Sequence, residues 1–315
     1  MAPMIIPRAP RHVIRQAALV CLGVMSGAVA FAAEPPVNLV AHYTITMTHV
    51  QVGELKWTVN FADPAYLASA SGKASGVFSV LVKGEGAFST RGAMAGAALT
   101  PAVARSDISD DDGTYETEMT FENGVLKRVE DRGDAAPADR IPVAKKLLQN
   151  VDDPLSAMLI PAEQEAMAPA NCHRTLKIYD GRRRYDLALS YKRTDKVKMT
   201  RGYAGSALVC GVVLRPIGGY KPDSLLVRYL AGKDDLEMWF APIKGTTYMA
   251  PVKALMPTLV GTMEIAADEF FERKAAPPQE KAVETTPAET AKPVDVAPVD
   301  PPKPVEAAPL EPAKP

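Results

Sequence analysis

Three consecutive arginines follow a tight turn in the segment "IYDGRRRYDLAL", residues 178–189. Arginine guanidinium groups suit planar, two-pronged binding of a phosphate or a carboxylate. If the three side chains lie together, they could form a site for an anion. If they lie apart, they are solvent-exposed charges beside the turn of a hairpin and help to keep it soluble. The choice depends on how the neighbouring strands position the side chains.

The neighbouring strands decide which side chains share a face. A two-residue turn at Asp180-Gly181 predicts that Tyr179 lies opposite Arg182, and side chains alternate outward from that turn. The predicted polar face then carries five side chains: Lys177, Tyr179, Arg182, Arg184 and Asp186. Arg183 falls on the opposite, apolar face, where its guanidinium has to reach water or a buried carboxylate. The sequence therefore predicts no single cluster of three arginines.

A candidate site for an anionic group consists of six residues: Lys177, Tyr179, Arg182, Arg184, Tyr220 and Lys221. We assign structural roles to three others: Asp180, Gly181 and Arg183. Charge is also segregated, because residues 174–201 hold ten basic against three acidic side chains, and residues 107–139 hold eleven acidic against three basic. The two segments can face each other or water. Alternatively, the basic face can bind an anionic envelope component, such as a phospholipid head group, lipopolysaccharide or a wall polymer.

The sequence carries none of the common catalytic motifs. It has no GxSxG nucleophile elbow, no HExxH zinc motif and no GxxxxGK[ST] phosphate loop. Asp180 and Asp186 could pair for acid-base chemistry, but the turn needs Asp180 and an ion pair on its own face engages Asp186. Three histidines lack metal-ligand spacing: His42, His49 and His173. We therefore predict no catalytic residue, no metal site and no cofactor, with an unrecognised hydrolase as the alternative.

The first 32 residues have the pattern of a secretory signal. Three arginines precede an apolar run over residues 17–29, and an A-x-A pattern for signal peptidase ends at residue 32. The run is too short for a comfortable membrane span, although an uncleaved anchor is the alternative. No later stretch approaches 18 apolar residues. We expect export by the Sec pathway to the periplasm, and no integral membrane domain.

Two cysteines, Cys172 and Cys210, remain after the signal. In an oxidising compartment an even number of cysteines predicts a disulfide. Its closure would stabilise the fold by roughly 4 kcal/mol in the chain-entropy model. Two reduced, buried cysteines are the alternative.

The body of the chain, residues 37–274, is predicted to consist mostly of strands joined by hairpin turns. Residues 42–61 alternate in hydrophobicity around a turn at Gly53, and residues 114–130 alternate around Asn123-Gly124. Residues 225–242 and 248–271 are predicted as closing strands. Without a βαβ rhythm, these hairpins predict a single mainly β (α+β) domain. Its sheet is a curved antiparallel meander that forms a half-barrel or partly open barrel.

Two short helices are expected against this sheet. Residues 141–149 have Pro142 at a first helical position, and residues 152–160 have Asp152 or Asp153 as N-cap before Pro154. An irregular loop is the alternative for each. Residues 275–315 have a different composition, rich in Pro, Ala, Glu and Lys and without an aromatic residue. We expect this tail to be disordered.

Several segments resemble the bacterial domain-of-unknown-function family 3108. They are "YTITMTHVQVGEL", "VDDPLSAML", "LKIYDGRRRYDL" after one cysteine, "LRPIGGYKPD" after the second, "LEMWFAP" and "LVGTMEI". The resemblance covers roughly residues 37–265 and leaves out the Pro-rich tail. It implies an exported, mainly β domain without an established biochemistry, and it supplies no catalytic residue.

These features together predict a non-catalytic binding or carrier module for an anionic or amphiphilic component of the cell envelope. The formal net charge of -1 gives no global field that would attract nucleic acid. The tail keeps a different interpretation open, in which the protein is an envelope scaffold that binds a protein partner through its Pro-rich segment.

Overall fold

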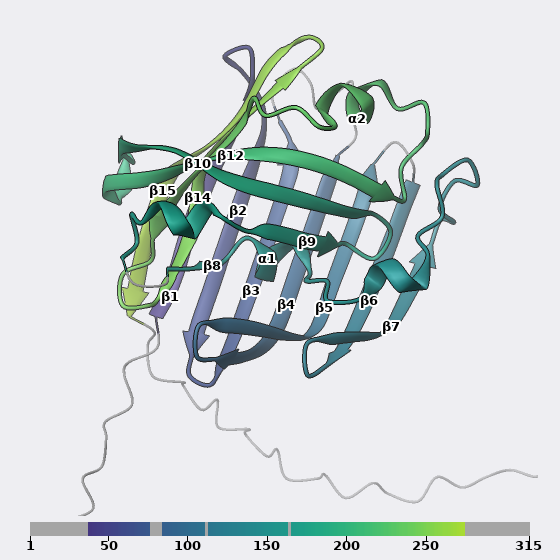
Figure 1. Cartoon of the computed structure of the whole chain (residues 1–315), viewed down its shortest axis with the longest axis horizontal. Coiled ribbons are helices and arrows are strands. Elements are labelled where there is room, and N and C mark those ends of the chain that lie inside the picture. Colours follow the sequence, from purple (N-terminus) through teal and green to yellow (C-terminus); the bar gives the residue numbers. More distant parts are fainter. Residues whose placement is uncertain (1–36, 76–83, 111–112, 163–164, 275–315) are drawn as a thin grey trace, which may run out of the picture. The chain divides into compact units, whose positions relative to one another are not determined.

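The computed structural model describes residues 37–75, 84–110, 113–162 and 165–274. The expected signal segment and the Pro-rich tail lie outside these residues. Within them, the chain forms one 15-stranded, mainly antiparallel sheet with two short helices (Figure 1). No helix of the described residues is long and apolar enough to cross a membrane.

The first half of the sheet is a meander in which each strand pairs with the next. Its seven strands are β1 (Val37–Met47), β2 (Val50–Ala62), β3 (Ala65–Ala74), β4 (Glu85–Ala95), β5 (Ala98–Asp110), β6 (Gly113–Glu122) and β7 (Val125–Gly133). The turn between β6 and β7 is the predicted one. Asn123 and Gly124 both have positive φ, at 51° and 74°, which this pair tolerates better than other residues do.

The second half is a second meander. Its main strands are β9 (Thr175–Tyr179), β10 (Arg184–Lys198), β12 (Ala204–Gly218), β13 (Leu236–Pro242), β14 (Tyr248–Thr258) and β15 (Gly261–Lys274). Two short strands lie off this path, with β8 (Ile160–Pro161) beside β14 and β11 (Arg201–Gly202) beside β15.

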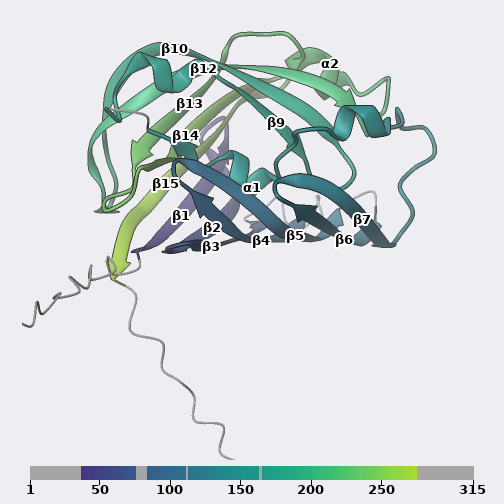
Figure 2. The same ribbon diagram turned by 60° about the horizontal axis from the view of Figure 1, so that its bottom comes forward.

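The two meanders join at the centre of the sheet. β1 and β15 pair along their length, from Val37 opposite Lys274 to Met47 opposite Met263. The first and last described strands are therefore central, and β7 and β9 form the two edges. Figure 2 shows how the sheet curls so that β9, β10 and β12 arch over β3 to β6. The predicted fold is confirmed, since the sheet is a curved antiparallel meander that does not close into a barrel.

The core fills the space under this arch. The side chains that alternate toward the arch, on what we call the inner face, are mostly apolar on both meanders. Trp57 and Phe61 from the first meander share one buried cluster with Trp239 and Phe270 from the second. The Phe61 ring also stacks on Tyr248, with 5.3 Å between ring centroids. Burial of large aromatic side chains from both halves makes the two meanders one folding unit.

Helix α1 (Pro154–Ala157) packs inside the arch, as its sequence predicts. The Asp153 side chain caps it by accepting hydrogen bonds from the Leu155 and Ser156 amides, and Pro154 occupies the first turn. Thr90 of β4 donates to the same Asp153 oxygen at 2.5 Å. This cap therefore also fixes the helix to the inner face of the sheet.

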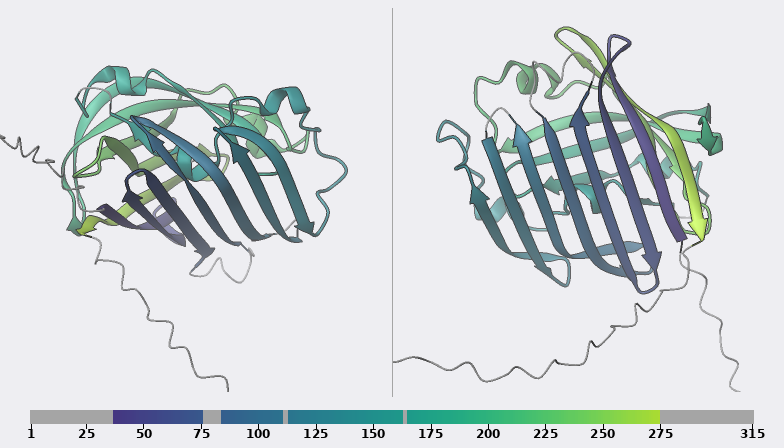
Figure 3. Two further views of the ribbon diagram at one scale, coloured as in Figure 1. Left: turned by 90° about the horizontal axis from the view of Figure 1, so that it is seen from below. Right: turned by 180° about the vertical axis from the view of Figure 1, so that it is seen from behind.

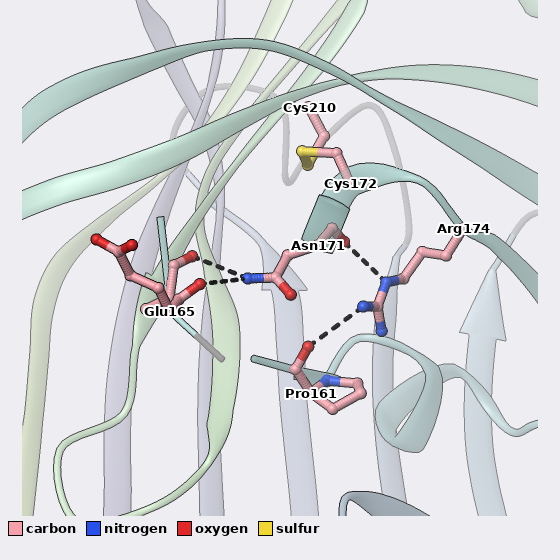
Figure 4. Close-up of a disulfide and its surroundings, with 7 residues drawn as sticks. Pro161, Glu165, Asn171, Cys172, Arg174 and Cys210 are labelled. Atoms are coloured by element: carbon pink, nitrogen blue, oxygen red, sulfur yellow. Dashed lines mark hydrogen bonds between the residues drawn. A yellow bond between two sulfur atoms is a disulfide. The ribbon is translucent and has the colours of Figure 1, made fainter. Parts of the chain in front are cut away.

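The predicted disulfide between Cys172 and Cys210 is present, and it joins a 3-10 turn (Pro169–Cys172) to β12 (Figure 4). The buried Asn171 side chain donates to the carbonyls of Glu165 and Ala166. Arg174 donates to the Asn171 and Pro161 carbonyls. The disulfide therefore anchors the connecting segment before β9 to the middle of the second meander.

Three local predictions are wrong. The first hairpin turns at Thr48-His49 and not at Gly53. Gly53 lies inside β2 and pairs with Ile45 of β1. The neighbouring β14–β15 hairpin supports this turn, because the Thr48 amide donates to the Thr262 carbonyl. Such a tertiary contact is not visible in local sequence.

The other two errors concern helices. Residues 225–230 form helix α2 (Leu225–Leu230) and not a strand, because the Ser224 hydroxyl accepts from the Val227 amide as an N-cap. Of the helix predicted over residues 141–149, only a 3-10 turn forms (Lys145–Leu148), and no side chain caps it.

Candidate functional site

The segment with three arginines forms a four-residue loop and not a two-residue turn. Tyr179 pairs with Arg184, two positions away from its predicted partner Arg182. Residues 180–183, which we call the closing loop, connect β9 and β10. The Asp180 carboxylate accepts from the Arg182 and Arg183 amides at 2.9 and 2.5 Å, which stabilises the longer loop.

The closing loop lies against the opposite edge of the sheet. Arg182 donates to both oxygens of Asp131 on β7, and its guanidinium lies 3.5 Å from the centroid of the Tyr115 ring on β6. The Thr117 hydroxyl on β6 donates to the Asp180 carbonyl. The basic and acidic segments therefore face each other here, one of the two arrangements that the charge segregation allowed.

Arg184 and Arg183 both lie in environments other than those that the sequence predicted. Arg184 is only 4% exposed, and its guanidinium donates to the Leu147 and Tyr185 carbonyls and to Asp186. Arg183 is in the loop and not on the apolar face, with Asp180 and Asp110 carboxylates each 3.7 Å from its guanidinium. The longer loop leaves Arg183 outside the strand, whereas Arg184 keeps the predicted face beside Tyr179 and is buried there against the Leu147 carbonyl.

The other candidate residues lie at separate places around the closing loop. Gly219 packs against the backbone of the closing loop and so places Tyr220 beside it, where burial raises the pKa of the Tyr220 hydroxyl. Lys221 lies 3.9 Å from Asp139, and Lys177 is exposed opposite Asp186. Two large cavities lie elsewhere on the chain, and none of the six predicted residues lines either of them.

Both cavities lie on the outer face of the first meander, the face turned away from the arch (Figure 3, right). Their volumes are about 590 and 780 Å³. They form one continuous depression, which we call the outer trough, because four residues line both: Lys56, Ser71, Ala87 and Asp107.

Strand register builds this trough. Lys56, Ser71, Ala87, Asp107 and Glu116 are successive cross-strand partners on β2 to β6. Strands are about 4.8 Å apart, so Lys56 and Asp107 stand roughly 14 Å from each other across a floor of small side chains. The next row along the strands continues this floor with Thr58, Ser69 and Ser89.

The charged walls of the trough are partly paired. Arg105 donates to Glu118 at 2.8 Å, and this hydrogen bond lowers the pKa of the Glu118 carboxyl. Within the described part of the chain, Lys56, Asp107 and Glu116 form no ion pair. The trough therefore presents an ammonium group on one side and two carboxylates on the other.

A buried network of hydroxyl groups and one carboxylate lies inside the core. The Tyr66 and Ser156 hydroxyls lie 2.6 Å apart. The Ser156 amide donates to the Asp153 carboxylate, and so does the Thr90 hydroxyl. All four side chains are at least nine-tenths buried. This network fixes helix α1 to β3 and β4. Among the described residues, no group of three His, Cys, Asp or Glu side chains could hold a metal ion.

The comparison with protein families gives a match over most of this architecture. The family model of the Protein of unknown function (DUF3108) matches residues 42–268. The chain belongs to the DUF3108 family. The resemblance stated from its segments is thereby confirmed, and the matched range of the DUF3108 domain contains the outer trough, the closing loop and the disulfide.

The DUF3108 chain is also similar to the solved structure of a beta-barrel-like protein of domain of unknown function DUF1849 from Brucella abortus. The two share 9% sequence identity and superpose with a TM-score of 0.44, over 76% of this chain and 98% of the other. A comparison with curated proteins gives no match.

Proposed function

We propose that this protein is a non-catalytic binding module of the periplasm and that the outer trough holds a polar component of the cell envelope. The observation that carries the proposal is the trough itself, a long depression with a floor of small hydroxyl and methyl side chains between charged walls. The signal-like N-terminus and the disulfide support a periplasmic location, because disulfides persist in oxidising compartments.

The charges of the trough favour one class of ligand. Its walls carry four basic side chains against seven acidic ones, in addition to His42. An acidic polymer would be repelled, whereas amino groups would be attracted to Asp107 and Glu116 and a carboxylate would be attracted to Lys56. Among envelope components, a wall polymer with peptide branches carries both groups. The trough therefore favours a wall polymer over a phospholipid head group or lipopolysaccharide.

Co-sedimentation of the mature protein with purified, peptide-bearing cell-wall polymer tests the proposal. Substitutions Ser71→Trp and Ala87→Trp each fill the floor, and Ala98→Trp at the exposed β4–β5 turn is the matched control. We expect each floor variant to reduce binding about tenfold or more, and the control to bind like the wild type. If both floor variants bound the polymer as well as the control, the outer trough would not be the binding site. Binding to lipopolysaccharide instead of the wall polymer would overturn the ligand class.

A further inference from the structure

Two hairpins extend together beyond the body of the domain. The β1–β2 turn and the β14–β15 turn lie side by side at the top of Figure 1 and of the right-hand view in Figure 3. The Thr48 amide donates to the Thr262 carbonyl at 3.0 Å, and the Thr48 hydroxyl donates to the Val260 carbonyl at 3.4 Å. The described chain ends, Val37 and Lys274, pair at the other end of the same strands.

The end of this projection is apolar. Val50, Met47, Met263 and Met256 are successive cross-strand partners on β2, β1, β15 and β14, and they form one row across four strands. The exposed fractions of Val50, Leu259 and Val260 are 49, 57 and 77%. We call these six side chains, together with Thr48, the apolar tip. Methionine side chains are flexible and polarizable, so the row adapts to an irregular apolar surface.

The apolar tip is also free of charge. Residues 44–53 and 254–263 contain no Asp, Glu, Lys or Arg, although such residues make up 23% of the chain. Hairpin ends that face water are usually polar, because turn residues hydrogen-bond with solvent and the turn lies on the surface. The β14–β15 turn, with Leu259 and Val260, is instead apolar, and the β1–β2 turn held against it, Thr48-His49, carries no Asp, Glu, Lys or Arg.

We propose that the apolar tip inserts reversibly into the surface of a lipid bilayer. Exposure is largest at the extreme end of the projection, so the tip is convex, and a fluid bilayer can accept a convex apolar tip without a matching groove. A second copy of the chain is a poorer occupant. Two convex tips would bury only a few side chains, well below the roughly 1,000 Å² that a specific interface needs.

Other exposed side chains agree with this orientation. Helix α2, which carries the exposed Leu225 and Leu226, lies at the same end of the domain (Figures 1 and 3). Thr44 and Glu54, on the two strands that form the β1–β2 turn, also line the outer trough. A domain docked through the apolar tip would hold one end of the trough close to the membrane surface.

Flotation with phosphatidylcholine vesicles tests the proposal on the mature full chain. The double variant Leu259→Ser with Val260→Ser removes the end of the tip. The matched control is Leu67→Ser with Val125→Ser, which removes one exposed leucine and one exposed valine (52 and 44% exposed) from other parts of the first meander. We expect the tip variant to lose vesicle binding about tenfold or more, and the control to bind like the wild type.

Two further measurements separate insertion from other causes. Binding driven by apolar burial should change little between low and high salt, unlike binding through exposed charges. In Val260→Trp, tryptophan emission should shift to the blue with vesicles and be quenched by brominated lipid, whereas in Leu67→Trp it should do neither. Equal vesicle binding by the tip variant and the wild type would overturn the proposal. The proposal would also be overturned if the wild type did not bind vesicles but formed oligomers, and if the tip variant no longer formed them. These vesicles contain no wall polymer, so the result is independent of the trough.

Discussion

The guanidinium of Arg182 and the carboxylate of Asp131 form a two-pronged ion pair, with Nη2–Oδ1 and Nε–Oδ2 distances of 2.6 and 2.9 Å. Arg182 is in the loop before β10, and Asp131 is on β7, the edge strand of the other meander. The two edges of the sheet do not pair through backbone hydrogen bonds. This side-chain contact, together with Tyr115 under the guanidinium, connects them instead.

Removing the Arg182 side chain should therefore destabilise the domain. Its side chain is 8% exposed, whereas that of Asp131 is 37% exposed and can be rehydrated. We expect Arg182→Ala to lower the free energy of unfolding by about 2 kcal/mol, less than the loss of a fully buried pair. Urea denaturation measures this difference. Arg128→Ala, a well-exposed arginine on the same edge strand, should change stability by less than about 0.5 kcal/mol. Equal effects at the two positions would contradict a closing role for Arg182.

The order of stability effects among the neighbouring arginines should be opposite to the order that alternation predicts. Arg184 is buried and donates to two carbonyls and Asp186, so Arg184→Ala leaves buried acceptors without partners. We expect a loss of about 3 kcal/mol for Arg184→Ala and about 1 kcal/mol for Arg183→Ala, whose carboxylate partners lie 3.7 Å away. Thermal unfolding of the two single variants decides the order. A lower melting temperature for Arg183→Ala would support the two-residue turn.

The sequence was sufficient for those parts of the fold that depend on local patterns. The Asn123-Gly124 turn, the α1 cap at Asp153 and the meander order all follow from neighbours within a few residues, and they are correct. The Cys172–Cys210 disulfide also followed, because the chain after the expected signal segment holds only these two cysteines.

The parts that the sequence did not predict depend on distant contacts. The register at Tyr179 follows from a loop that Asp180 stabilises and that β6 and β7 hold from the other meander. The trough floor joins Ser71 on β3 to its cross-strand partner Ala87 on β4. Single small residues carry no signal of their own, so only the assembled register reveals the floor.

The disulfide should contribute substantially to stability. It links residues 38 positions apart, and in the chain-entropy model such a link stabilises the folded state by about 4 kcal/mol. The double variant Cys172→Ser with Cys210→Ser should show this loss in urea denaturation. Reductant should lower the melting temperature of the wild type and leave the double variant unchanged. Intact mass with and without reductant on protein taken from the periplasm checks that the bond forms there, and two free thiols would contradict it.

Gly181 should tolerate no side chain, because of both its backbone and its neighbour. Its φ is +101°, and a Cβ atom there would lie 2.5 Å from the Thr117 hydroxyl oxygen. Gly96 offers a matched control, with a φ of +62° and nothing within 4 Å of an added Cβ. We expect Gly181→Ala to destabilise the domain by about 1 to 2 kcal/mol more than Gly96→Ala, in thermal or urea unfolding. Equal losses would show that the closing loop does not pack tightly against β6.

Stability should fall as pH rises through the range in which the carboxyls before α1 titrate. Burial, followed by the nearby charge of Asp153, raises the pKa of Asp152 to about 6. Burial also raises the pKa of Asp153 and of Asp180. The pKa of such a carboxyl is higher in the folded than in the unfolded chain. Its contribution to stability is fully present below the unfolded pKa, at about pH 4, and is lost as pH rises through the folded pKa.

The Asp152→Asn variant isolates this effect, because its amide has a similar shape and does not titrate. The difference in unfolding free energy between wild type and variant should change by about 2 kcal/mol between pH 4 and pH 7.5, with the wild type relatively less stable at the higher pH. Glu237, whose pKa its hydrogen bond with Arg193 lowers, acts with the opposite sign and at lower pH. It is present in both proteins, so its contribution cancels in the difference. Urea denaturation of the two proteins at several pH values measures the curve. Parallel curves would show that Asp152 titrates in the folded chain as it does in the unfolded one.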